Sequence, residues 1–535
     1  MTPMPELVRI QRALVSVSDK ADLAPLANAL HGLGVEIIST GGTAKAIAES
    51  GVPVTPIEEL TGFPEIMDGR VKTLHPMVHG GLLALRDKPE HQKQMDEHGI
   101  KPIDLVCVNL YPFERTVSQP GVDRAEAIEQ IDIGGPSMIR SAAKNFDHVC
   151  VVTSPKQYDR LVSELQKHEG AVSQTLRAEF AAAAFARTAE YDAAISTFLG
   201  RRVSPPFPDV LNLRYAKVDS LRYGENPHQD AALYRDPAST GPSIVNSEQV
   251  HGKPLSYHNI NDAAAALELV KDFRRIAPGR IGAAVIKHTN ACGGAVGDSA
   301  LDAVNAALAG DPLAAFGGIL AVNGVLDAVA AEALCREGVF LEVIAAADFE
   351  PEAREILTAR SAALRLLAVG EKSGSPALKL DYRSIPGGML VQTRDTRIAS
   401  PEQWQHAAGP GPAEADIADA AIVWTIAKHL KSNAVAVGGR EGDGRPARLF
   451  GAGAGLMDRV TACRLAIEKA GANARGAIAA SDAFFPFPDG PETLINAGVR
   501  LIVHPGGSKR DQETFDLCDQ RGVTCLVTGR RHFRH

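Results

Sequence analysis

The sequence predicts an α/β protein of two domains, and three observations carry this prediction. Short apolar runs alternate with amphipathic stretches, as strands and helices do in a parallel sheet covered on both faces. The chain has 535 residues, which exceeds the ~250–300 residues at which one hydrophobic core stops growing. Three prolines within residues 205–208 cannot continue a helix and indicate a linker. We therefore expect a first domain over residues 1–200 and a second over residues 201–535.

The first domain should begin with a strand and a helix that buries one face. Apolar side chains recur at helical spacing at Leu23, Leu26, Ala27 and Leu30. A long Ala-rich helix is expected over residues 171–199 at the end of the domain. Strands are expected at residues 13–17, 35–39, 103–110 and 149–152.

The second domain repeats the alternation of strands with helices, so it should also be α/β. Its strands are expected at residues 282–286, 318–322, 434–437, 476–480 and 501–503.

Composition excludes several classes of function. The net charge of −8 argues against a general nucleic-acid-binding protein, and no apolar run approaches the ~18 residues that span a bilayer. The first twelve residues lack the pattern of a secretory signal. Seven cysteines without a CxxC pair indicate reduced thiols, most of them in the core. We expect a cytoplasmic protein with neither nucleic acid nor membrane as a partner; the basic residues 530–535, taken alone, are typical of a solvated tail.

Two segments that follow predicted strands of the first domain are typical of phosphate sites. Both combine hydroxyls or glycines with the start of a helix, where free N–H groups attract anions. Each segment alone also fits a structural turn or a helix cap, but two at successive strand ends favour a phosphate. The candidate phosphate ligands are Ser18, Lys20, Thr40, Gly41, Gly42 and Thr43.

Further along the first domain, residues 69–76 place two cations, a hydroxyl and an imidazole in one short segment. Residues 131–137 suggest a strand end and a glycine turn, with Pro136 starting a helix. Lys144 would lie about two turns into that helix, where a solvated lysine is the alternative.

These segments carry a first resemblance. The series SVSDK, STGGT, DGRVKTLHP, NLYPF and IDIGGPSMIRSAAKN resembles the inosine monophosphate (IMP) cyclohydrolase domain, which has the methylglyoxal synthase-like fold. The Gly-Gly segments alone would also fit a methylglyoxal synthase or a regulatory ligand-binding domain of that fold. The resemblance implies that Lys72 and Thr73 contact the reacting formyl group, that Tyr111 and Asp132 handle proton movement and orientation, and that Lys144 stabilises the developing oxyanion.

In the second domain, the predicted strand 282–286 leads directly into Lys287 and His288. An adjacent lysine and histidine at a strand end are candidates for acid–base chemistry, although such a dipeptide alone is more often found on an ordinary surface. Six segments around them resemble the aminoimidazole carboxamide ribonucleotide (AICAR) formyltransferase family, whose α/β subdomains are cytidine deaminase-like. They are LRYGENPHQ, SYHNI, AFGG, KSNA, SDAFFPF and PGGS.

This second resemblance implies that His288 is the base toward the exocyclic amine, while Lys287 stabilises the intermediate or protonates the leaving folate nitrogen. Where the family often has Pro, Gln and Gln, this chain has Ala291, Leu456 and His504. The implied folate contacts are Phe316, Asp482, Phe484 and Phe485. The implied nucleotide contacts are Arg222, Tyr223, Asn259, Glu342, Asn433, Arg531 and Phe533.

Together the two resemblances imply the last two steps of IMP synthesis in a homodimer. 10-Formyltetrahydrofolate would be the cosubstrate, with no tightly bound cofactor. The glycine run 451–455 does not meet the dinucleotide-binding spacing, and residues 290–294 lack the zinc ligands of deaminases. The alternatives are a nucleotide-binding regulatory protein that lost activity, and a chain in which only one half is active.

Overall fold

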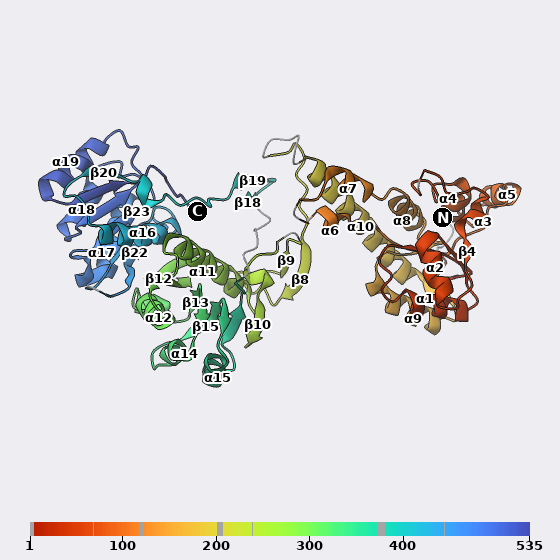
Figure 1. Cartoon of the computed structure of the whole chain (residues 1–535), viewed down its shortest axis with the longest axis horizontal. Helices are drawn as coiled ribbons and strands as arrows, with labels where there is room; N and C mark the ends of the chain where they lie inside the picture. Colours follow the sequence, from red (N-terminus) through yellow and green to blue (C-terminus); the bar gives the residue numbers. More distant parts are fainter. Residues whose placement is uncertain are drawn as a thin grey trace. The chain divides into compact units, whose positions relative to one another are not determined.

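The computed structural model describes residues 5–67, 69–117, 119, 121–200, 207–237, 239–371, 380–442 and 444–535. The chain forms two compact units, Met1–Arg214 and Tyr215–His535 (Figure 1). The boundary expected near residue 201 lies outside the described residues.

The first unit is built on a sheet of five parallel strands in the order β4-β3-β2-β5-β6. The sequence predicted the parallel sheet and four of its strands, but not β4. A short antiparallel pair, β1 (Leu7–Arg9) with β7 (Ala171–Ser173), lies apart from it. The five strands are β2 (Arg12–Val17), β3 (Glu36–Ser39), β4 (Thr55–Pro56), β5 (Leu105–Asn109) and β6 (Cys150–Val152).

Helices surround this sheet. Helix α1 (Leu23–Gly32) buries the four predicted apolar residues, and the long helix α10 (Gln174–Gly200) begins only after β7. The others are α2 (Gly41–Glu49), α3 (Ile57–Thr61), α4 (Pro76–Leu83), α5 (Pro89–Glu97), α6 (Phe113–Val117), α7 (Arg124–Glu129), α8 (Gly134–Lys144) and α9 (Tyr158–Lys167).

Two local predictions in this unit were wrong. Gly41, Gly42 and Thr43 form the first turn of α2 rather than a loop before it. Residues 131–133 are not the end of a strand, and α8 begins at Gly134, before Pro136. The first difference brings the N-terminus of α2, with its free N–H groups, closer to the end of β3 than the sequence suggested.

The second unit is built on one sheet of twelve strands. The five predicted strands are present, but two hairpins, β11–β12 and β21–β22, interrupt the expected alternation and make the sheet mixed. In spatial order the strands are β10 (Glu248–His251), β17 (Arg365–Ala368), β15 (Leu341–Ala346), β13 (Gly318–Val322), β11 (Ile281–Lys287), β12 (Asn290–Gly297), β22 (Ala447–Gly453), β21 (Val435–Gly439), β23 (Ile478–Ser481), β24 (Leu501–His504), β25 (Thr524–Val527) and β20 (Gln405–Ala408).

The two halves of this sheet have the same topology. Counted outward from the β12–β22 contact, each half has a hairpin, three mutually parallel strands and an antiparallel edge strand. The central strands β12 and β22 pair antiparallel, so the halves are related by an approximate two-fold axis through the sheet. Consequently, β11 ends at the edge where β21 begins.

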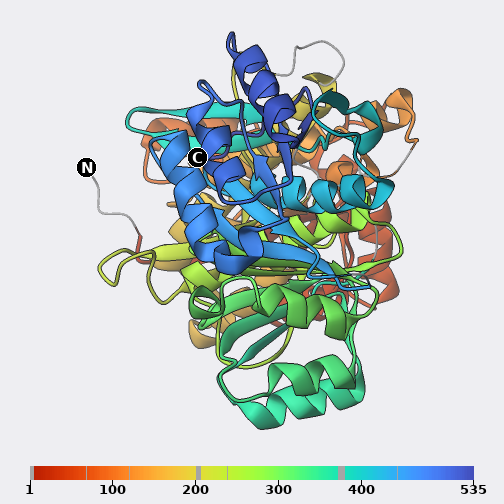
Figure 2. The same cartoon turned by 90° about the vertical axis from the view of Figure 1, so that its left-hand side faces the viewer.

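Helices cover both faces of the sheet (Figures 1 and 2). Helices α11 (Tyr257–Ile276) and α16 (Glu414–Lys428) pack in one apolar core that spans both halves. Each half has a further core on the opposite face. The helices there are α12 (Ala300–Leu308), α13 (Pro312–Ala315), α14 (Ala328–Leu334), α15 (Pro351–Arg360), α17 (Arg459–Ala470), α18 (Asp489–Asn496) and α19 (Asp511–Arg521).

Three small two-stranded sheets complete the described part of the second unit. They are β8 (Ala216–Leu221) with β9 (Ala231–Arg235), β14 (Val325–Leu326) with β16 (Asp348–Phe349), and β18 (Leu380–Ile385) with β19 (Gly388–Thr393). A search of the described residues finds no helix with the length and hydropathy needed to cross a membrane.

Two candidate active sites

The carboxyl ends of the parallel strands in the first unit meet at one sheet edge, where the predicted phosphate ligands lie. The hydroxyls of Thr40 and Ser16 share a 2.8 Å hydrogen bond. Thr43 Oγ1 accepts from the amide of Val17 and donates to its carbonyl, at 3.1 and 3.0 Å. Both threonines are therefore occupied in joining β2 to α2, and the open N–H groups belong to the first turn of α2.

The structure brings Lys20 to that first turn. Its Nζ lies 3.9 Å from the place where a Cβ on Gly42 would be. Asn109, at the end of β5, fixes the neighbouring segment: its Oδ1 accepts from the amides of Ser18 and Asp19, at 2.6 and 2.9 Å. Asn109 begins the NLYPF segment, but the sequence analysis did not single it out as a site residue. The ammonium group of Lys20 and the free N–H groups at the start of α2 thus lie close together, which is the arrangement that an anion site requires.

A second cluster at the same edge contains Thr73 and Asp132. A Cβ on Gly134 would lie 2.6 Å from Thr73 Oγ1, so this hydroxyl sits against the start of α8. Asp132 Oδ1 accepts from the amide of Gly135 at 2.9 Å. The amide of Asp132 donates to the hydroxyl of Tyr191 at 2.8 Å, which anchors this segment to α10.

The carboxyl group of Asp132 is electrostatically unusual. Burial raises its pKa above the ordinary value, and the amide of Gly135, the charge of Lys72 and the amide of Tyr111 offset only part of this rise. Lys72 Nζ also lies 3.8 Å from Glu65, a residue that sequence reasoning missed. A carboxyl whose pKa is raised in this way is a candidate for proton exchange with a bound substrate.

Of the remaining predicted residues in this unit, Tyr111 lies near Asp132 and is 41% exposed. Lys144 is not brought to the cluster. It is the exposed last residue of α8, about 15 Å along the helix axis from Gly134. The next residue, Asn145, donates to the carbonyls of Leu82 and Ala84 at the far end of α4.

In the second unit, one sheet edge collects most of the predicted residues. The end of β11 meets the starts of β12, β13, β15 and β21 and the ends of β22 to β25 at this edge. Predicted residues at or shortly beyond these strand ends are Lys287, His288, Phe316, Glu342, Asn433, Asp482, Phe484, Phe485, Arg531 and Phe533.

Lys287 and His288 stand at the centre of this edge. Lys287 Nζ donates to the carbonyl of Phe316 at 2.8 Å. His288 is exposed, and within the described ranges its ring has no hydrogen-bond partner. Asn259 Nδ2 donates to Glu342 Oε2 at 2.8 Å, which joins the start of α11 to β15. A free imidazole at a strand end, one residue after a lysine, is suited to proton transfer with a bound substrate.

The predicted folate contacts divide into exposed and buried residues. Phe316 is 56% exposed and Phe484 is partly exposed, so both offer an apolar surface. Phe485 is 1% exposed and belongs to the core of the second half. Asp482 is fully buried and is bound by Arg459, a residue that sequence reasoning missed. Neither buried side chain reaches the surface of this unit.

Arg459 also holds a predicted nucleotide ligand. Its Nη2 donates to Asn433 Oδ1 at 2.7 Å. Asn433 Nδ2 donates in turn to the carbonyl of Leu456 at 2.8 Å. This contact uses the backbone of Leu456, so the departure from the family residue leaves it unchanged. The other departures, Ala291 and His504, are both buried.

One predicted pair is peripheral, and a second lies at the site edge. The guanidinium of Arg222 lies 5.4 Å from the ring of Tyr223, after β8, and no described contact joins this pair to the Lys287 edge. Arg531 stacks on Phe533 at 4.4 Å. This tail is bound to the site edge, because the amide of His532 donates to the carbonyl of Asp482 at 3.0 Å. The backbone of the basic tail is therefore held at the site edge, while Arg531, Phe533 and His535 stay exposed.

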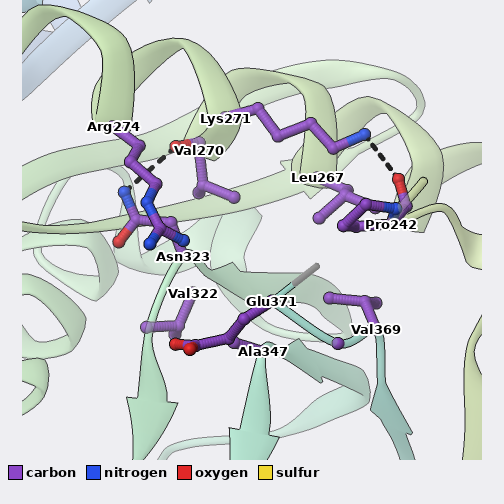
Figure 3. Close-up of a pocket in the computed structure, with 11 residues that line it drawn as sticks. Pro242, Leu267, Val270, Lys271, Arg274, Val322, Asn323, Ala347, Val369 and Glu371 are labelled. Carbon is purple, nitrogen blue, oxygen red and sulfur yellow. Dashed lines mark hydrogen bonds between the residues drawn. The ribbon is translucent and has the colours of Figure 1, made fainter. Parts of the chain in front are cut away.

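A small pocket lies at the opposite edge of the sheet, under α11 (Figure 3). Two of its polar groups are already used in the fold: Lys271 donates to the carbonyl of Pro242, and Asn323 donates to that of Val270. We assign no site to it. In the described part of the chain, no three His, Cys, Asp or Glu side chains gather as metal ligands.

Comparisons with known proteins identify the family of the chain. Residues 142–469 match the model of the AICARFT/IMPCHase bienzyme, and residues 22–137 match that of the MGS-like domain. The bifunctional purine biosynthesis protein PurH of Oceanobacillus iheyensis is 45% identical over 98% of this chain and 100% of its own length. The chain belongs to the AICARFT/IMPCHase bienzyme family.

A second curated relative matches equally well, and one solved structure matches part of the chain. PurH of Neisseria gonorrhoeae is 46% identical over 98% of this chain and 99% of its own length. The solved structure of ForH is 38% identical, covers 36% of this chain and 100% of that chain, and has a TM-score of 0.34. As a member of this family, the chain is a bifunctional enzyme of the last two steps of IMP synthesis, formyl transfer to AICAR and ring closure to IMP.

Proposed function

We propose that the two reactions are divided between the two units, with ring closure at the carboxyl edge of the first sheet and formyl transfer at the Lys287–His288 edge of the second. The observation that carries this proposal is that each unit has its own cluster of acid–base groups. The charge of Lys72 acts on Asp132 in the first unit, and Lys287 directly precedes His288 in the second.

Formyl transfer joins the exocyclic amine of AICAR to the formyl carbon of 10-formyltetrahydrofolate. The amine is a weak nucleophile, so a base must take its proton as the carbon–nitrogen bond forms; we assign this step to His288, whose ring is free. Lys287, held by Phe316, stabilises the negative charge of the tetrahedral intermediate. The intermediate then releases tetrahydrofolate, whose leaving nitrogen is protonated.

Ring closure needs less covalent help, because the carboxamide nitrogen attacks the formyl carbon of the same molecule and water is then lost. Positioning and charge stabilisation should dominate this step. We assign orientation of the formyl group to Lys72 and Thr73, and proton exchange to Asp132 with Tyr111. The phosphate would lie at Lys20 and the first turn of α2, where a cation and free N–H groups meet.

The finer assignments follow from this division. 10-Formyltetrahydrofolate would bind as a diffusible cosubstrate against exposed Phe316 and Phe484. A homodimer would cover the exposed apolar residues of that edge. We place the enzyme in the cytoplasm, since all seven cysteines are free and five of them are buried.

The test mixes the purified enzyme with AICAR and 10-formyltetrahydrofolate and follows tetrahydrofolate and IMP separately. Wild type should form both. His288→Ala should stop tetrahydrofolate formation but still convert supplied formylated intermediate to IMP. Lys72→Ala should form tetrahydrofolate and accumulate the formylated intermediate. If either substitution abolishes both products in a folded protein, the division of labour is wrong.

A further inference from the structure

His288 lies in a tight turn whose backbone conformation does not favour the residue types found there. His288 and Thr289 are the two residues between β11 and β12, which Lys287 and Asn290 close as a pair. Both have left-handed backbones, with φ of 53° and 61°. Two positive φ values are the mark of a type I′ hairpin, which favours Asn-Gly; for a β-branched threonine the conformation is strained, at a cost of order 1–3 kcal/mol.

The carboxylate of Asp262 binds this turn from α11. Its Oδ2 accepts from the amide of His288 at 2.9 Å, and its Oδ1 accepts from the amide of Thr289 at 2.8 Å. Asp262 is 9% exposed, so these two bonds use a largely buried charge. Charge-assisted bonds of this kind are about twice as strong as neutral ones, which matches the scale of the strain they offset.

The other side of the turn is held as well. The carbonyl of His288 accepts from Thr289 Oγ1 at 2.7 Å and from Asn290 Nδ2 at 3.2 Å. Every backbone polar group of His288 thus has a partner, while its ring has none in the described part of the chain. These contacts fix the backbone of His288, and with it the direction of the ring, but none of them involves the ring.

The topologically equivalent place in the other half of the sheet offers a comparison. Asp419 on α16 is 3% exposed, and its carboxylate binds Arg440, the residue that directly follows β21. There the carboxylate holds a side chain, and β22 begins only at Ala447. A buried aspartate on the preceding helix therefore holds the hairpin in both halves, but only Asp262 binds the backbone of a candidate base.

We propose that Asp262 is a positioning residue for formyl transfer: it keeps His288 in the left-handed turn from which the imidazole reaches the amine of AICAR. This inference rests on the proposed role of His288. Because Asp262 acts through the backbone, its loss should lower the rate of the chemical step while leaving substrate binding almost unchanged.

Asp262→Asn tests this proposal, because the amide can accept from one of the two N–H groups but points its own N–H₂ at the other. We expect kcat of formyl transfer to fall by about 10- to 100-fold, the scale of a misplacement of about 1 Å. KM for AICAR should change less than about twofold, and ring closure of supplied intermediate should stay at the wild-type rate.

A rescue separates positioning from simple destabilisation. Thr289→Gly removes the strain of the second left-handed residue, so the turn needs the carboxylate less. The double variant Asp262→Asn/Thr289→Gly should recover at least about fivefold of the lost kcat, whereas Thr289→Gly alone should change it little. Asp419→Asn is the matched control: it should lower Tm and leave kcat within about twofold.

The proposal is overturned if Asp262→Asn lowers Tm as Asp419→Asn does and leaves kcat unchanged. It is also overturned if kcat falls and Thr289→Gly restores none of it. His288→Ala, measured alongside, isolates the underlying assumption: if that variant still transfers the formyl group, the assigned role of His288 fails and the role of Asp262 fails with it.

Discussion

The guanidinium of Arg459 donates to the carboxylate of Asp482 inside the second unit, where the aspartate is fully buried and the arginine is 7% exposed. The same carboxylate accepts from the amide of Ala434 at 3.1 Å. The pair therefore joins the start of α17, the start of β21 and the end of β23. Its location makes Asp482 part of the scaffold beneath the site edge.

Arg459→Met should destabilise the second unit by about 3–5 kcal/mol, because it leaves a buried carboxylate without its counter-charge. The two tryptophans, Trp404 and Trp424, both lie in this unit, so urea unfolding followed by tryptophan fluorescence reports on it selectively. The double variant Arg459→Met/Asp482→Leu should lose less than the single one. A loss below about 1 kcal/mol for Arg459→Met would show that the pair is dispensable.

Gly134→Ala should impair ring closure without destabilising the first unit. Gly134 has no positive φ, so alanine fits the helix, yet its Cβ would lie 2.6 Å from Thr73 Oγ1 and must displace that hydroxyl. We expect kcat for conversion of supplied formylated intermediate to fall at least about tenfold, on the scale of a lost or misplaced catalytic contact. Gly32→Ala, whose Cβ would meet nothing within 4 Å, is the control and should behave as wild type. Equal activity of the two variants would remove Thr73 from the site.

Lys72→Ala and Lys144→Ala should have very different effects on ring closure. The charge of Lys72 acts on Asp132, whereas Lys144 ends α8 away from the cluster. Removing a charge that stabilises a transition state typically costs about 10²–10³ in kcat; we expect this for Lys72→Ala and less than about threefold for Lys144→Ala. A large loss for Lys144→Ala, in a protein of unchanged Tm, would mean that the helix end or the substrate moves during the reaction.

Strands with β-branched apolar residues could be predicted from the sequence, but β12 and β22 could not. Both are rich in glycine, which is uncommon within strands. Side chains at Gly451 and Gly453 would collide with the backbone of α17, so glycine is what lets this helix pack closely on the sheet. The run 451–455, which superficially suggests a dinucleotide loop, is thus mostly strand packed against a helix.

The site residues that carry recognisable chemistry could be proposed from sequence, but the residues that hold them could not. Asp262 lies 26 residues before His288, and Asn109 lies 91 residues after Ser18. Each is an ordinary polar residue whose role arises only when distant strand and helix ends meet. The same reason explains why Phe485 and Asp482 resembled folate contacts: a motif places residues at an edge but does not say which of them face inward.

His504 should make the second unit sensitive to mild acid. Its imidazole is fully buried at the end of β24; Nδ1 accepts from the amide of Gly506 at 3.2 Å, and Nε2 has no hydrogen-bond partner among the described residues. Burial lowers its pKa from 6.5 to about 4, and the charge of Asp511 offsets only part of this. Between these two pH values the unfolded chain binds a proton that the folded chain does not, so stability must fall as the pH drops from about 6.5 to 4 and must be independent of this group above 7. The shift corresponds to about 3 kcal/mol at most.

Urea unfolding by tryptophan fluorescence at pH 7.5 and 4.5 should show this loss in wild type and a smaller one in His504→Gln, whose side chain does not titrate. If the two proteins lose the same stability, the imidazole takes up its proton in the folded state as readily as in the unfolded chain, and the acid sensitivity belongs to other groups.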